Sequence, residues 1–467
     1  MRLAPRLDFP VPLACLVVRQ VLALAAALAL LSPAKAAVLA YLPNQSAASV
    51  AVIDVSTGAQ IATVPVGAAP IGVAVAPNGR YVYVTLHNSD AVSVISTNNN
   101  SVQAQIPVGT KPMGVAVSPD GTRLYVSNYP TATASGGGSQ WANGTLTVID
   151  TVNRLALASI FVGANPAGVA VSPDGSRAYV ANSGSGTLSV VSTASNAVTS
   201  TIPVGSNPFG VAVSPDGQRV YVANSGDASL SVINAAALNV TSTIRVGGHA
   251  MGVAVSDDSA RVVVSNPFDN SISVINASMQ TVVATTTAGI GAAPAGVSFA
   301  PSGSIALVAN SRAGTVSAVN AISGNASAFG PGGLGSPLSL GKFVATTPLC
   351  ALNVSGDGSV SAGSDGLLIL RHMLGFRGAA LTQGITGIGA GVTATMIEQS
   401  IAALNLDADG DATARPTTDG LLIVRALLSL TDVALVTGAR NTASATVRSA
   451  PQVLQWIANT HGTSCLI

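Results

Sequence analysis

Two polar loops near the C-terminus contain the residues best suited to binding a metal ion. In each loop, oxygen-bearing side chains alternate along a short stretch, and a carboxylate stands about twelve residues after the first of them. Ca²⁺ takes six to eight oxygen ligands from such a loop and from an acid at the start of the next helix. The pattern predicts one or two calcium ions. The expected ligands are Asn353, Ser355, Asp357, the Ser359 carbonyl, Ser361 and Asp365 in the first loop, and Asp407, Asp409, Asp411, the Thr413 carbonyl and Asp419 in the second.

The two loops belong to a tandem duplication. An offset of 54 residues aligns Asp365 with Asp419 and Arg371 with Arg425, and an apolar helix is expected after each loop. This pattern resembles dockerin domains. The resemblance implies calcium-dependent folding and a cohesin-like protein partner. This chain departs from it in three ways: both loops are one residue longer than usual, Ala412 replaces the glycine at the kink, and Arg415 stands where an oxygen ligand is expected.

The N-terminus indicates export, and export bears on how the cysteines are interpreted. Arginines precede the apolar run at residues 21–31, and Ala34-Lys35-Ala36 fits the site cut by a signal peptidase. A signal peptide is therefore expected over residues 1–36, with the mature chain secreted or periplasmic. Cys350 and Cys465 remain after cleavage and bracket the calcium loops, so a disulfide between them is expected.

The 300 or so residues before the calcium loops form an internal repeat. Any binding site outside those loops must therefore be positioned by this repeat. The sequence Gly-Val-Ala-Val recurs near every 42 residues, with one insertion at residues 131–144. Each unit divides into four short strands, a period and strand number typical of β-propeller blades. The repeated glycines are Gly72, Gly114, Gly168, Gly210, Gly252 and, in a looser copy, Gly296.

The count of strands predicts how the ring closes. The second strand of the unit occurs seven times, beginning with Tyr-Leu-Pro-Asn at Tyr41, but only six first strands precede these copies. We expect residues 335–345 to supply the missing inner strand, because closure by the chain ends leaves no exposed sheet edge.

The repeats resemble the YVTN family of β-propeller proteins over residues 38–345. Together, the repeats and the calcium loops predict an all-β seven-bladed β-propeller followed by a small α-helical dockerin-like calcium-binding domain. The expected boundaries are 37–346 for the propeller and 347–467 for the second domain.

Most polar residues of the repeat are interpreted as scaffold. An asparagine ends most second strands, and an aspartate recurs in the Ser-Pro-Asp-Gly turns, which suits side chains that hydrogen-bond neighbouring backbone.

Residues that differ between blades are better candidates for binding a small molecule or a glycan. These are Lys111 and His249 before first strands, Asp227 and Asp269 between second and third strands, and Trp141 in the insertion. The alternative is that they are scattered, solvated loop residues.

Charge excludes some function classes. Only 8% of residues are charged and the formal net charge is +1, so the basic footprint that nucleic acid requires is missing. No later segment reaches transmembrane length, so no membrane anchor is expected, and we expect a monomer.

Two functions remain. The first is a secreted, non-enzymatic binding or scaffold protein, in which the propeller presents a loop face and the calcium module attaches to a protein or glycan at the cell surface. The alternative is an exported hydrolase or lyase, lactonase-like or carbohydrate-active, delivered by the dockerin-like module. Residues 38–345 contain no glutamate and two histidines, which favours the first.

Overall fold

The computed structural model describes residues 38–346 except 98, 131–142 and 302, together with residues 34–35 and scattered positions between 359 and 453. It divides the chain into one compact unit at residues 37–347 and a second made of the remaining residues. Among the described residues, no helix is both long and apolar enough to cross a membrane.

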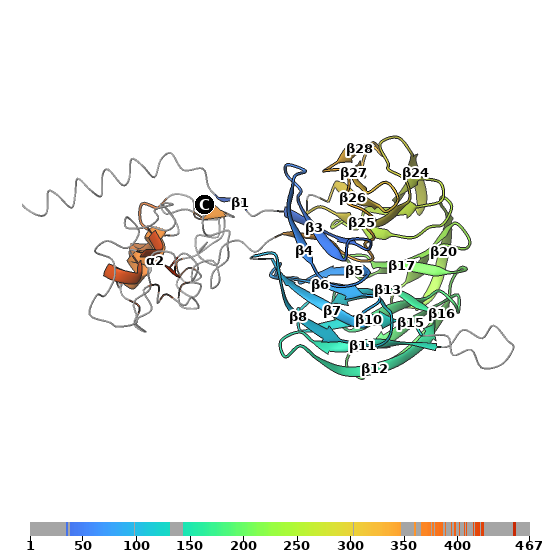
Figure 1. Ribbon diagram of the computed structural model, residues 1–467, viewed down its shortest axis with the longest axis horizontal. Helices are drawn as coiled ribbons and strands as arrows, with labels where there is room; N and C mark the ends of the chain where they lie inside the picture. The colour runs from blue at the N-terminus through green and yellow to red at the C-terminus, as the bar shows by residue number, and fades with distance from the viewer. Residues whose placement is uncertain are drawn as a thin grey trace, which may run out of the picture. The chain divides into compact units, whose positions relative to one another are not determined.

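Seven four-stranded antiparallel sheets form a propeller, as predicted. Figure 1 shows inner strands such as β5, β13 and β17 near the middle of the ring, with β12, β20 and β28 toward its outside. From the inner to the outer edge, blade 1 is β29 (Val344–Thr346), β2 (Val38–Asn44), β3 (Ser49–Asp54) and β4 (Gln60–Pro65); blade 2 is β5 (Pro70–Val75), β6 (Tyr81–Leu86), β7 (Ala91–Ser96) and β8 (Ser101–Pro107); blade 3 is β9 (Pro112–Val117), β10 (Arg123–Asn128), β11 (Asn143–Asp150) and β12 (Leu155–Ala164).

The remaining blades repeat the same order. Blade 4 is β13 (Pro166–Val171), β14 (Arg177–Asn182), β15 (Thr187–Ser192) and β16 (Ala197–Pro203); blade 5 is β17 (Pro208–Val213), β18 (Arg219–Asn224), β19 (Ser229–Asn234) and β20 (Asn239–Arg245); blade 6 is β21 (Val253–Val255), β22 (Arg261–Asn266), β23 (Ser271–Asn276) and β24 (Thr281–Thr286); blade 7 is β25 (Pro294–Phe299), β26 (Ile305–Asn310), β27 (Thr315–Asn320) and β28 (Ala326–Phe329).

The chain ends close the ring, as predicted. Strand β29 pairs antiparallel with β2, placing Val344 opposite Ala40, while Phe343 is fully buried in the core of blade 1. The regular strand is only three residues long and occupies the end of the predicted segment. Blade 1 is therefore built from both ends of the propeller sequence.

Glycine in the inner strands allows neighbouring blades to approach closely. At Gly210 an added Cβ would lie 2.2 Å from the Met251 carbonyl oxygen of the next blade. Five other inner-strand glycines meet a neighbouring carbonyl oxygen in the same way, at 2.2–2.4 Å: Gly72, Gly114, Gly168, Gly252 and Gly296. The repeated glycine is thus a packing requirement of the ring.

Repeated polar side chains hydrogen-bond within blades and, in places, between them, as the scaffold interpretation expects. Asn224 donates from Nδ2 to the hydroxyls of Ser229 and Ser231 on the adjacent third strand, rather than to the backbone of the next turn. Arg177 links blades by donating to the Ala235 carbonyl of blade 5. Asp174 accepts from the Ser176 N–H within its turn, at 3.0 Å.

In the C-terminal unit the described elements are few. They are the strands β1 (Ala34–Lys35) and β30 (Ser359–Val360), which pair antiparallel, the helices α2 (Leu367–Met373) and α3 (Ala379–Thr382), and the π-helical segment η2 (Pro416–Gly420). Arg371 of α2 donates to the carbonyls of Leu381 and Gln383, which ties α2 to the end of α3. The predicted dockerin-like arrangement lies mostly outside the described residues and stays a prediction.

Candidate ligand-binding site at the channel mouth

The segment Gly335–Thr346, here called the strap, contains the main departure from the repeat. In blade 3, Asn128 lies opposite Pro112 and Leu124 opposite Val117, a span of five positions along the inner strand. In blade 1, Asn44 lies opposite Pro337 and Ala40 opposite Val344, a span of seven. The strap therefore carries two extra residues over the same length of second strand, which makes it bulge away from regular pairing.

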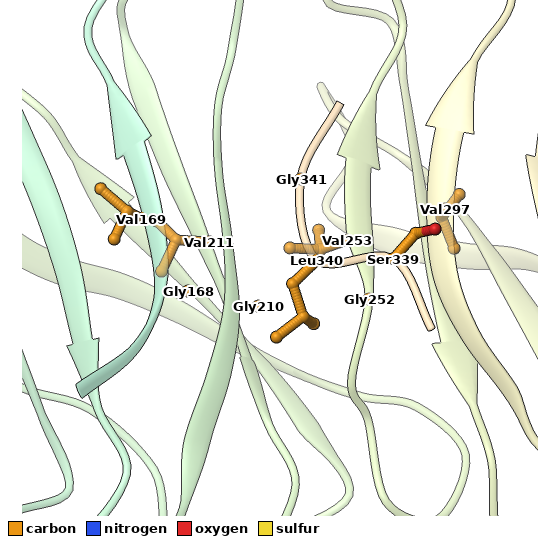
Figure 2. A pocket seen from close by; sticks show the side chains of 10 residues that line it. All are labelled: Gly168, Val169, Gly210, Val211, Gly252, Val253, Val297, Ser339, Leu340 and Gly341. Atoms are coloured by element: carbon orange, nitrogen blue, oxygen red, sulfur yellow. The ribbon is translucent and has the colours of Figure 1, made fainter. Parts of the chain in front are cut away.

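The bulge places Leu340 in the central channel, near the inner strands of blades 4 to 7. Leu340 forms a parallel bridge with Gly72, and only 4% of its surface is exposed. Figure 2 shows its side chain between the strands that carry Gly210 and Gly252. The space left beside it is about 20 Å³, room for about one water molecule. Leu340 thus closes the channel.

Gly341 allows the strap to follow this path. Its φ is +117°, a backbone conformation that side-chain-bearing residues rarely adopt. A Cβ at this position would lie 2.4 Å from the Val73 carbonyl oxygen. The backbone of Leu340 is hydrogen-bonded to blade 2 beside it, since its carbonyl accepts the Val73 N–H at 3.1 Å and its N–H donates to the Ile71 carbonyl at 3.4 Å.

On one side of this closure lies a cavity of about 590 Å³, surrounded by the turns that join first and second strands. We call it the turn-mouth cavity. Inner strands of all the blades contribute to its wall, and most of the side chains are alanine, valine or proline. Representative lining residues are Ala74, Val117, Ala212, Val255 and Phe299.

Two charged residues line the turn-mouth cavity, and they lie at different positions along the channel. Lys342 belongs to the strap, where it lies along the chain between Leu340 and the buried Phe343. Asp257 stands two residues beyond the end of β21, in the turn at the outer rim, and is exposed. The backbone of the positively charged residue therefore lies further along the channel from the turns than that of the negatively charged one.

Four of the binding residues predicted from the sequence lie on the opposite face: Lys111 and His249 in connections between blades, and Asp227 and Asp269 in turns between second and third strands. Asp227 accepts the Ser206 N–H at 2.6 Å, and Asp269 accepts the Gly248 N–H at 2.5 Å. Each carboxylate thus holds the connection leading into its own blade. These contacts give both aspartates a structural task.

On that face, His249 contacts two neighbouring side chains at the surface. Its Nδ1 lies 2.8 Å from the Ser225 hydroxyl, and its ring stacks on Phe268 with centroids 6.3 Å apart. Phe268 is 79% exposed and was not among the predicted residues. The sequence signal for it was available, because an aromatic residue there is peculiar to blade 6.

Lys111 lies three blades away from His249 around the ring. Its backbone N–H donates to Asp90 at 2.7 Å, beside His87, whose Nδ1 lies 3.3 Å from the Pro112 carbonyl. Burial lowers the pKa of His87. The structure therefore groups Lys111 with His87 and Asp90, and His249 with Phe268. Trp141 lies outside the described residues.

Most predicted calcium ligands, and both cysteines, also lie outside the described residues. Ser359 is found in β30. Asp419 is fully buried in η2 and accepts the Thr418 hydroxyl at 2.9 Å. In the described part of the chain, no three histidine, cysteine, aspartate or glutamate side chains gather as a metal site would require.

Comparison with known proteins supports the propeller and leaves the activity open. A family model described as lactonase, seven-bladed β-propeller, matches residues 101–243, from the last strand of blade 2 to that of blade 5. No curated protein matches the chain.

Two solved structures share the fold. Hydrazine synthase from Kuenenia stuttgartiensis superposes with a TM-score of 0.52 at 22% identity, over 62% of this chain and 92% of that one. A functionally unknown protein from Desulfotomaculum acetoxidans DSM 771 superposes with a TM-score of 0.56 at 14% identity, over 66% of this chain and 98% of that one. At these identities the likeness concerns the fold alone.

Proposed function

We propose that this chain is an exported, non-enzymatic binding protein that holds a small molecule with an apolar body in the turn-mouth cavity. The observation that carries the proposal is the cavity itself, about 590 Å³ in volume and lined mostly by alanine, valine and proline. Small-molecule sites typically span about 300–1,000 Å³ and combine an apolar wall with few polar groups. Because Leu340 closes the inner end, the ligand enters and leaves through the turn mouth.

A neutral fluorescent probe tests this binding function. N-phenyl-1-naphthylamine should bind the full chain at one saturable site. Ala212→Leu adds bulk to the cavity wall and should weaken binding about tenfold or more, since one misfitting side chain costs about 1–3 kcal/mol. Ala236→Leu, in an exposed turn, is the matched control and should bind normally. Equal binding by both folded variants would contradict the cavity as the site.

The region after Pro348 is proposed as a calcium-dependent attachment module for a protein or glycan at the cell surface, a cohesin-like protein among them. The support is the alternation of oxygen donors in both loops, together with the burial of the Asp419 carboxylate. When bound, calcium would be held by these carboxylates and would cross-link each loop to the helix that follows it. The propeller and this module would then divide ligand binding and attachment between them.

Calcium titration by calorimetry tests the module. Binding to the folded state raises stability by about 2.7 kcal/mol at a calcium concentration of 100 times Kd. Asp419→Asn should reduce this gain, whereas Asp257→Asn in the propeller should leave it unchanged. Identical unfolding temperatures with calcium and with chelator would overturn the ligand assignment.

A lactone hydrolase is the second candidate, favoured by the family model that matches residues 101–243. In the turn-mouth cavity, Lys342 could stabilise an oxyanion and Asp257 could accept a proton from water. Steady-state hydrolysis of γ- and δ-lactones separates the two functions. Turnover lost in both Asp257→Asn and Lys342→Gln would establish the enzyme; binding without turnover supports the non-enzymatic proposal.

A further inference from the structure

The turn-mouth cavity is electrically asymmetric because of the strap. Six regular inner strands line it with small or apolar side chains, and the seventh adds Lys342 through its two-residue bulge. We propose that the cavity selects anionic amphiphiles, small molecules with an apolar body and one carboxylate or sulfonate group, and that Lys342 is the residue that selects them. This inference rests on the binding function proposed above.

The position of Lys342 determines the orientation of such a ligand. Lys342 is exposed to the cavity and lies next to Phe343, whose carbonyl accepts the Tyr41 N–H at 2.8 Å. The backbone beneath the lysine is therefore held in place. Its ammonium is a compact charge with three donors on a flexible stem, so it can meet an acidic group without a fixed geometry.

No carboxylate neutralises Lys342 in the described part of the chain. The other charged lining residue, Asp257, stands in an exposed turn at the rim, beyond the end of β21. Because this residue is exposed, its charge is screened by solvent and salt. An acidic group therefore fits at the inner end of the cavity, with the apolar body packed against the alanine and valine wall.

The opposite assignment, a cationic ligand, fits the same residues less well. A cation would have to stay at the rim beside Asp257, because the like charge of Lys342 repels it from the inner part of the cavity. An anion satisfies Lys342 and leaves Asp257 in water, so the anionic amphiphile is the better match.

Two fluorescent probes with the same ring system test the inference on the full chain. N-phenyl-1-naphthylamine is neutral, and 1-anilinonaphthalene-8-sulfonate adds a sulfonate to that skeleton. Lys342→Gln should weaken sulfonate binding about fivefold, the scale of an exposed ion pair, and leave the neutral probe unchanged. Lys342→Arg should restore the sulfonate affinity. Lys111→Gln, on the opposite face, is the charge-matched control and should change neither probe.

Salt supplies an independent measurement. Raising ionic strength from about 0.01 M to about 1 M shortens the screening length from about 30 Å to about 3 Å. Over this range the affinity of the wild-type chain for the sulfonate probe should fall about fivefold, the same loss that Lys342→Gln causes at low salt. The affinity of the Lys342→Gln protein for this probe should change little with salt.

The outcomes distinguish two failures. If both probes bind and Lys342→Gln affects neither or both equally, anion selection is wrong while the binding function stands. If neither probe binds at a saturable site, the binding function and this inference fail together.

Discussion

The strap and the inner strand of blade 5 occupy equivalent positions in their blades, but they contribute differently to the channel. Strand β17 (Pro208–Val213) pairs with β18 from Pro208 opposite Asn224 to Val213 opposite Val220, and its Gly210 lets the next blade approach closely. The strap spans the matching interval with two more residues and has Leu340 and Lys342 between its ends. The regular strand only packs, whereas the strap closes the channel and adds a charge to the cavity.

This contrast locates function where the repeat is broken. Side chains that recur from blade to blade mostly act within the scaffold, as the Nδ2 of Asn224 does by donating to two serine hydroxyls. The strap completes blade 1 and is the one inner strand that does not follow the Gly-Val-Ala-Val repeat, so its side chains can differ from those of the other six. A bulge in such a strand redirects side chains while pairing is kept at both of its ends.

The largest predicted effect concerns the buried anchor of the strap. Phe343→Ala should lower the free energy of unfolding by about 3–5 kcal/mol, because Phe343 is fully buried in the core of blade 1. Phe268→Ala is the matched control, since Phe268 is 79% exposed, and should change stability by less than about 0.5 kcal/mol. Urea denaturation of both variants measures the difference. Equal losses would mean that the strap does not anchor blade 1.

The next effect tests the regular inner strand. Gly210→Ala should destabilise the propeller by about 1–3 kcal/mol, because its Cβ would lie 2.2 Å from the Met251 carbonyl oxygen. Gly332→Ala provides the control, as nothing lies within 4 Å of a Cβ added there. Thermal unfolding compares the pair. A Gly210→Ala protein as stable as Gly332→Ala would refute the close approach of blades.

A smaller effect is expected where a hydroxyl joins two blades. Ser127 accepts the Gly114 N–H and donates to the Ala167 carbonyl of blade 4, whereas blade 4 has Ala181 at the equivalent position. Ser127→Ala should cost about 1 kcal/mol, the net value of a buried hydrogen bond. Ser195→Ala, at an exposed serine, should cost almost nothing. If Ser127→Ala and Ser195→Ala unfold at the same urea concentration, the hydrogen bonds of Ser127 contribute no stability.

The smallest effect is a pH dependence of the repeated turns. Hydrogen bonds from Ser172 and Ser176 lower the pKa of Asp174 to about 2 from an ordinary value of 3.8. The folded state therefore binds its proton less readily, so the stabilisation is complete above about pH 4 and lost as the pH falls toward 2. Asp174→Asn should flatten the stability curve slightly over this window. Unfolding midpoints measured from pH 5 to pH 2 test the sign, and an unchanged slope would contradict it.

The regular part of the fold followed from the sequence because its signals are local and repeated. Period, strand count and the missing first strand were enough to predict seven blades and closure by residues near 335–345. The repeated asparagines were expected to bond neighbouring backbone, whereas the Nδ2 of Asn224 donates to hydroxyls of the third strand. Side-chain partners across strands depend on register, which a repeat pattern does not specify.

The candidate site was harder to predict for a physical reason. Leu340 and Lys342 belong to a segment whose β-character was visible, but the two-residue excess appears only when Pro337 and Val344 are matched to their partners on β2. The irregular aspartates drew attention to the other face, where Asp227 and Asp269 bind backbone N–H groups. A useful signal was the replacement of Gly-Val-Ala-Val by Leu-Gly-Lys-Phe.

Hydrogen–deuterium exchange of the full chain, with and without 1-anilinonaphthalene-8-sulfonate, tests most directly whether the strap forms the binding site. The account predicts that the ligand slows exchange in the strap around Lys342 and in neighbouring inner strands such as β21, which both line the cavity. Protection confined instead to the opposite face, around Lys111 and His249, would contradict it.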